Sequence, residues 1–94
     1  KLISVKPSPT KTKKYVATFK LDNDKEKKVS FGAKGYTDYI LSKDDARKER
    51  YLNRHRAREN WNDPLTPGAL SRWILWNKKT IKSSIADFKK RFKL

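Results

Sequence analysis

The sequence predicts a small α+β domain in which a β-hairpin packs against three helices. Two patterns carry this prediction. Apolar residues alternate with polar ones over residues 15–21 and again over 28–31, which is the period of a strand, and later recur every three or four positions, which is the period of a helix. At 94 residues the chain can fill one hydrophobic core but not two, so we expect a single domain.

The hairpin is expected from two alternating segments, residues 15–21 and 28–31, separated by the turn-forming residues Asp22-Asn23-Asp24. Residues 1–14 combine five lysines with two prolines, a composition that resists helix formation and buries little surface. We therefore expect residues 1–14 to form a flexible basic arm outside a domain of residues 15–94, with Leu2–Val5 as a candidate third strand at the sheet edge. The glycines after Phe31 predict a loop that ends near Ile40.

Three helices are expected in the rest of the chain. Ser42 followed by Asp45 resembles a capping box and predicts a helix over about 43–60. Thr66-Pro67 predicts a second helix over about 67–77, and Thr80 caps a third. The expected core comprises the three tryptophans and an apolar stripe on the third helix: Trp61, Trp73, Trp76, Ile81, Ile85, Phe88 and Phe92.

The net charge is the strongest indication of function. The chain has 25 Lys and Arg against 10 Asp and Glu, a formal net charge of +15 at pH 7. An excess of this size attracts polyanions over long distances, although a merely solvated surface is the simpler alternative. No apolar run reaches the roughly 20 residues that cross a bilayer, so we expect no membrane span. Cysteine is absent, which excludes disulfides, thiolate metal sites and a cysteine nucleophile.

A basic stripe is expected on the first helix. At about 100° per residue, five cations fall within an arc of roughly 80°. They are Lys43, Arg47, Arg50, Arg54 and Arg58. Aligned like charges destabilise a solvated helix slightly, so the stripe favours an anionic partner over chance in an Arg-rich chain. Arginine also grips phosphate oxygens in two-point contacts.

The last segment, residues 78–94, carries a second group of candidate nucleic-acid-binding residues. They are Lys78, Lys79, Lys82, Lys89, Lys90 and Arg91. Such runs act as electrostatic clamps on phosphates without reading the base sequence. Together with the stripe they predict non-specific binding of nucleic acid, with duplex DNA as the favoured partner.

The aromatic residues of the expected loop have two possible roles. Phe31, Tyr36 and Tyr39 could stack on unpaired bases, but large rings more often cover a hairpin as part of the core.

Catalysis is poorly supported by the sequence. His55 and Glu59 have metal-ligand spacing but supply only two ligands, and no Gly-rich phosphate loop accompanies the aspartates. We therefore expect no enzyme activity, no catalytic residue, no metal site, no cofactor and no small-molecule substrate. His55 is expected to be a partly buried hydrogen-bonding residue.

From Phe31 onward the chain resembles a family of short basic proteins of large nucleocytoplasmic DNA viruses. The shared elements are FGA-x-GY-x-DY at 31–39, R-K-E-R-Y-x-x-R-H at 47–55, Trp61, and LWNK at 75–78. The resemblance covers about two thirds of the chain. It implies a viral setting, namely the virion or the viral factory inside the infected cell, and supplies no mechanism.

Two functions from different classes fit this setting. In the first, the protein is a non-enzymatic, virion-associated structural protein that binds DNA or another polyanion through the Arg-rich helix. In the second, it is a minor capsid protein that cements the shell through contacts with other capsid proteins. A third, weaker alternative is an RNA-binding accessory protein. The discriminating observation is whether phosphates or acidic protein loops contact the arginines.

Overall fold

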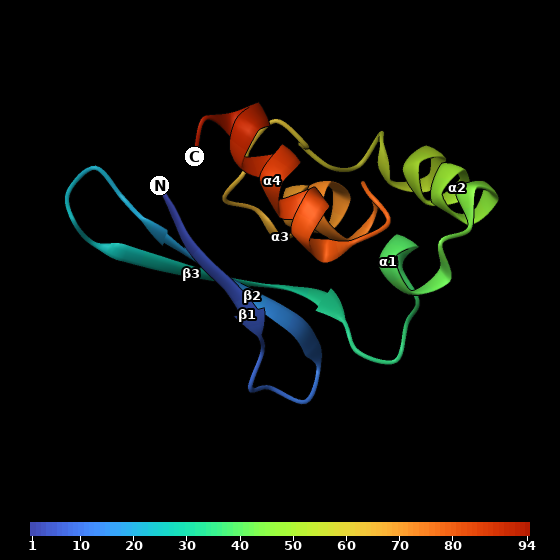
Figure 1. Cartoon of the computed structure of the whole chain (residues 1–94), viewed down its shortest axis with the longest axis horizontal. Coiled ribbons are helices and arrows are strands. Elements are labelled where there is room, and N and C mark those ends of the chain that lie inside the picture. Colours follow the sequence, from blue (N-terminus) through green and yellow to red (C-terminus); the bar gives the residue numbers. More distant parts are fainter.

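A computed structural model, which describes all 94 residues, shows a three-stranded antiparallel sheet covered on one face by helices (Figure 1). The strands are β1 (Leu2–Pro7), β2 (Lys13–Lys20) and β3 (Glu26–Ala33), in the spatial order β1-β2-β3. In the β2–β3 hairpin, Tyr15 pairs with Phe31 and their rings stack at 5.9 Å. The α+β class and the hairpin are thus confirmed.

The helical layer consists of five short elements. They are α1 (Tyr39–Ser42), α2 (Asp45–His55), α3 (Pro67–Leu70), the π-helix η1 (Ser71–Leu75) and α4 (Ile81–Phe92). The α3, η1 and α4 segments lie over the sheet, whereas α1 and α2 lie beyond one end of it (Figure 1). The Thr80 hydroxyl accepts a hydrogen bond from the Ser83 amide at the start of α4, which confirms the expected cap.

The prediction of a flexible arm at residues 1–14 is wrong for most of that segment. The candidate edge strand is present and extends to Pro7, where the missing amide does no harm at a sheet edge. Leu2 is buried in the core, and the backbone amide of Ser8 donates to the Lys14 carbonyl at 2.9 Å. Backbone pairing with β2 and burial of Leu2 order this segment, although its lysine- and proline-containing composition suggested that it would bury little surface.

The loop expected from Phe31 to Ile40 is shorter than predicted. Strand β3 continues through Gly32 to Ala33, and α1 begins at Tyr39. Gly32 has a positive φ of 77°, and a Cβ there would lie 2.8 Å from Leu75 Cδ1. Gly32 therefore does not end the strand. Its missing side chain instead allows η1 to pack directly on the sheet.

The predicted helix at 43–60 has different limits. Lys43 adopts the left-handed conformation and ends α1, so α2 starts later and takes Asp44 as its cap in place of Ser42. At the other end α2 stops at His55. The predicted helix at 67–77 is also interrupted: α3 passes into η1, and the Trp76 amide donates to the Ser71 carbonyl at 3.0 Å in a wide π turn.

The core lies between the sheet and α3, η1 and α4. Phe19, Phe31, Ile74 and Phe88 are almost completely buried, and the rings of Phe19 and Phe88 are 6.4 Å apart. Trp76 is buried as predicted. Trp73 and three members of the predicted α4 stripe are partly buried at the core margin, namely Ile81, Ile85 and Phe92. The assignment of Trp61 to the core is wrong. Its side chain is partly buried outside the core cluster, donates to Glu59 and faces Arg72.

Replacing Phe88 with Ala should lower the free energy of unfolding by about 3–5 kcal/mol, because the ring is 0% exposed and its removal leaves a cavity. Leu41→Ala is the matched control, since that side chain is 69% exposed and should change stability little. Urea unfolding of both variants measures the difference. Equal stability of F88A and the parent would contradict this placement of the core.

Candidate nucleic-acid interface

A cleft of about 770 Å³ separates α2 from the end of the sheet. Its lining comes from β2, the end of β3, the loop between β3 and α1, α2 and Glu59 beyond it, and the segment from α3 through η1 to Trp76. Segments far apart in sequence therefore form its walls, with the sheet and loop on one side and the Arg-rich helix on the other (Figure 1). Clefts of this size accommodate one or a few nucleotide-sized groups.

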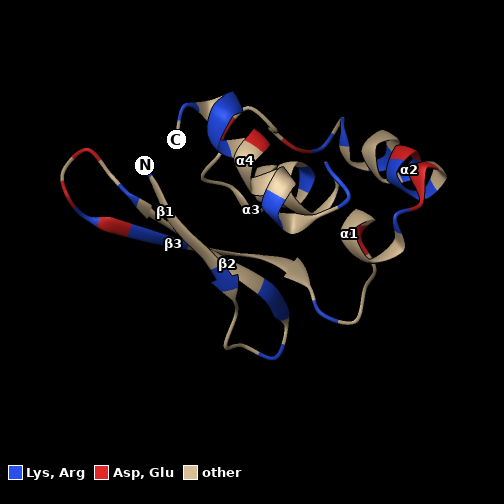
Figure 2. Cartoon of the chain, in the orientation of Figure 1, with Lys and Arg blue, Asp and Glu red and all other residues tan.

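The α2 wall of the cleft is cationic. Arg47, Arg50 and Arg54 line it, all three are exposed, and none forms an ion pair within the protein. Figure 2 shows basic residues on α2, together with acidic ones on the same helix. From the facing strand, Lys13 adds a fourth exposed cation. These four residues are hereafter called the cationic wall. Their charges are free to neutralise phosphates because no internal acid competes for them.

Two acids also line the cleft, and both are engaged by contacts within the protein. The Asp38 carboxylate lies 2.6 Å from Lys14 Nζ, and the two side chains are only 4% and 14% exposed. The same aspartate caps α1 by accepting from the Leu41 amide. Glu59 lies 3.1 Å from His55 Nδ1 and accepts from the Trp61 indole at 2.8 Å. The cleft has a net positive charge, because its lining holds five Lys and Arg residues against these two carboxylates.

The floor of the cleft is aromatic. The Tyr51 ring lies parallel to Trp76, with centroids 4.3 Å apart and planes 5° apart, and His55 stacks on Tyr51 at 4.3 Å. Burial, with a smaller contribution from Glu59, raises the pKa of the Tyr51 hydroxyl, which therefore stays neutral. The prediction that His55 is a partly buried hydrogen-bonding residue is confirmed.

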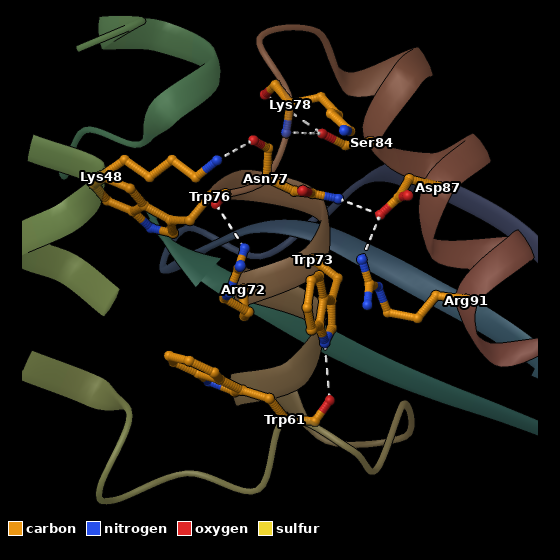
Figure 3. Close-up of polar contacts among 10 residues, drawn as sticks. All are labelled: Lys48, Trp61, Arg72, Trp73, Trp76, Asn77, Lys78, Ser84, Asp87 and Arg91. Carbon is orange, nitrogen blue, oxygen red and sulfur yellow. Dashed lines mark hydrogen bonds and ion pairs between the residues drawn. The ribbon is translucent and has the colours of Figure 1, made fainter. Parts of the chain in front are cut away.

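Polar contacts fix α2 relative to η1 and α4 (Figure 3). Lys48 Nζ donates to the Asn77 carbonyl at 2.7 Å, and the Asn77 amide donates to Asp87 at 2.7 Å. Burial, with further contributions from Arg72 and Lys78, lowers the pKa of Lys48. Lys48 thus faces the core, which leaves the other side of α2 to the arginines of the cationic wall.

The structure brings together only part of the predicted site. Lys43 lies before α2, and its amine donates to the carbonyls of Ile40 and Lys79. Arg58 follows the end of α2, and Arg91 stacks on Trp73 at 3.8 Å. None of these residues lines the cleft, nor do the other predicted cations of the C-terminal segment. Those cations, all exposed, are Lys78, Lys79, Lys82, Lys89 and Lys90.

Two cleft residues were missed as cations of the site, namely Lys13 and Lys14. Both were assigned to a flexible arm, so nothing in the sequence placed them opposite α2. The sequence patterns also gave no prediction for Arg72. Its guanidinium lies 4.1 Å from the Trp73 ring centroid and 5.4 Å from that of Trp61, and donates to the Trp76 carbonyl at 3.0 Å (Figure 3). Arg72 fixes the end of η1 and does not line the cleft.

Comparison with known proteins adds a family. The model of a family of unknown function, DUF5754, matches residues 3–55. The chain belongs to this family. The DUF5754 match runs from β1 to the end of α2 and so contains the cationic wall, Lys14 and the loop between β3 and α1. No curated protein and no solved structure matches the chain significantly.

Two further observations bear on the type of site. No helix of this DUF5754 member combines the length and apolar character needed to cross a membrane. No group of three or more His, Cys, Asp or Glu side chains is placed to hold a metal ion.

Replacing Asp38 with Asn should lower the free energy of unfolding by about 3 kcal/mol, because it leaves the Lys14 ammonium buried without its counter-ion. Asparagine can still cap α1, so the loss reports on the ion pair. Asp24→Asn removes the same charge from a side chain that is 89% exposed and should have little effect. Denaturant titrations that gave both variants equal stability would show that the pair does not hold the cleft together.

Proposed function

We propose that this protein is a non-enzymatic nucleic-acid-binding protein whose cationic wall neutralises backbone phosphates with little sequence preference. The observation that carries the proposal is the placement of Arg47, Arg50 and Arg54 on one exposed side of α2 without any internal counter-ion. Arginine's planar fork suits phosphate oxygens, and a net charge of +15 draws a polyanion toward the protein.

The placement of the acids supports this proposal over a merely solvated surface. The acids beside the cationic wall are already engaged, Asp38 with Lys14 and Glu59 with His55. A surface selected only for solubility usually intersperses charges of both signs. Here three like charges are spaced three and four positions apart on one helix, which destabilises the helix by a few tenths of a kcal/mol per pair. Binding of phosphates would reverse that cost.

The setting of this activity stays a prediction. The resemblance to proteins of large DNA viruses favours packaged or factory DNA as the nucleic acid, and the shared helix face of the arginines together with the net charge favours the duplex form. Lys82, Lys89 and Lys90 are exposed on α4 and would add phosphate contacts outside the cleft.

Replacing Arg47, Arg50 and Arg54 with Gln should weaken DNA binding and its dependence on salt. Each phosphate neutralised contributes about −0.9 to the slope of log affinity against log salt, so the triple variant should have a slope flatter by about 2–3 units. Its melting temperature should equal or exceed that of the parent, because repulsion along α2 is relieved. Fluorescence anisotropy titrations across a salt series measure the slope.

A charge-matched variant separates the site from the total charge. Replacing Lys25, Lys27 and Lys28 with Gln removes the same three charges from exposed positions outside the cleft. This variant should change the slope by less than about one unit. Equal slopes for the parent and the arginine variant would refute the proposal. Tight binding that is insensitive to salt would favour the alternative of contacts with capsid proteins.

A further inference from the structure

The loop between β3 and α1 presents one unusual side chain at the rim of the cleft. Tyr36 is 74% exposed, the most exposed large apolar side chain in the protein, and it lines the same cleft as the cationic wall. Phe31 and Tyr39, the other two aromatic residues considered for this segment, are buried in the core. Tyr36 is therefore the one ring of the three that is free to contact a ligand.

Tyr36 is held on an anchored loop. The Lys34 amide donates to the Thr12 carbonyl at 3.0 Å, and Lys34 Nζ donates to the Thr10 carbonyl at 2.7 Å. On the other side of Tyr36, Asp38 is fixed by its ion pair with Lys14. A ring presented from such a loop loses less conformational entropy on binding than one on a free segment.

Tyr36 is the last residue of a tight turn. The Tyr36 amide donates to the Ala33 carbonyl at 3.3 Å, which closes a four-residue turn with Gly35 as its third residue. Gly35 has a φ of 89° and nothing within 4 Å of a Cβ built on it. The glycine is thus required by the backbone conformation of the turn and not by packing. Tyr36, which follows this glycine, is exposed.

The other rings of the cleft are fixed in place. Tyr51 is sandwiched between Trp76 and His55, and Glu59 orients the His55 ring. The cleft thus combines a fixed aromatic floor, an exposed ring at its rim and a cationic wall. Proteins that bind single strands use this combination, in which cations track the phosphates and rings stack on successive bases. In a duplex the bases are already stacked on one another, so a rim tyrosine gains no such contact.

We infer that the cleft holds a single-stranded segment, in which the cationic wall contacts phosphates and Tyr36 stacks on an unpaired base. This inference rests on the nucleic-acid binding proposed above and narrows its ligand from the duplex to the single strand. Duplex DNA still binds through the cations alone, more weakly at equal phosphate number.

The test compares three probes: oligothymidylate and an abasic deoxyribose-phosphate strand of about 12 nucleotides each, and a duplex of about 12 base pairs whose affinity is compared per phosphate. The abasic strand keeps the phosphates and lacks the bases. The parent protein should bind oligothymidylate more tightly than the abasic strand. Tyr36→Ala should weaken oligothymidylate binding by about tenfold, the effect of losing one stacked base, and leave the other two probes unchanged. Tyr36→Phe keeps the ring and should bind as the parent does.

Leu41→Ala is the matched control, because Leu41 is 69% exposed and does not line the cleft. It should leave binding of all three probes unchanged. Thermal melts verify folding, which an exposed residue such as Tyr36 should not affect. The salt slope for oligothymidylate should also stay constant in Y36A, because no cation is removed.

The two proposals fail in different ways. If Y36A binds oligothymidylate as tightly as the parent, or weakens all three probes equally, the stacking inference is wrong while phosphate binding stands. If the triple arginine variant binds every probe like the parent, the proposed function is wrong and the inference fails with it.

Discussion

The parallel contact between the rings of Tyr51 and Trp76 determines where the arginines lie. Helix α2 has Leu52 as its only buried residue and makes few backbone contacts with the rest of the fold. Its position depends on the stacked ring of Tyr51, on Lys48 bonded to the Asn77 carbonyl, and on the Tyr39 hydroxyl donating to Asp45. Since Trp76 itself follows the π turn of η1, its contact with Tyr51 couples the three arginines on α2 to the segment packed on Gly32.

This attachment explains how a helix with many like charges stays folded. A helix is usually held in place by the apolar area that one of its faces buries. Helix α2 offers almost no aliphatic surface for such packing. Stacked rings and charge-assisted hydrogen bonds provide directional contacts in its place. Such contacts fix the rotation of the helix about its axis. Arg47, Arg50 and Arg54 consequently line the cleft, while Lys48 faces away from it.

Much of the fold could be predicted from local patterns, and the failures have a common physical origin. The hairpin, the turn at Asp22–Asp24 and the Thr80 cap depend on neighbouring residues and were predicted correctly. The order of residues 1–7, the role of Gly32 and the burial of Lys14 depend on partners distant in sequence. For the site, helical periodicity correctly aligned the three arginines of the wall. It wrongly added Lys43 and Arg58, because the limits of α2 are set by Lys43 in a left-handed conformation and by the turn after His55.

The separation of acids from the cationic wall is the feature that connects fold to function most directly. Asp38 neutralises Lys14, Glu59 holds His55 and the Trp61 indole, and Asp44 caps α2 through the amides of Ala46 and Arg47. Each acid near the cleft therefore stabilises a turn, a helix end or a buried cation. Because these acids are already engaged within the fold, none of them forms an ion pair with the arginines of α2. The arginines of α2 are thus left exposed without an ion pair at this surface, and under the proposed function a phosphate backbone would be the ligand that neutralises them.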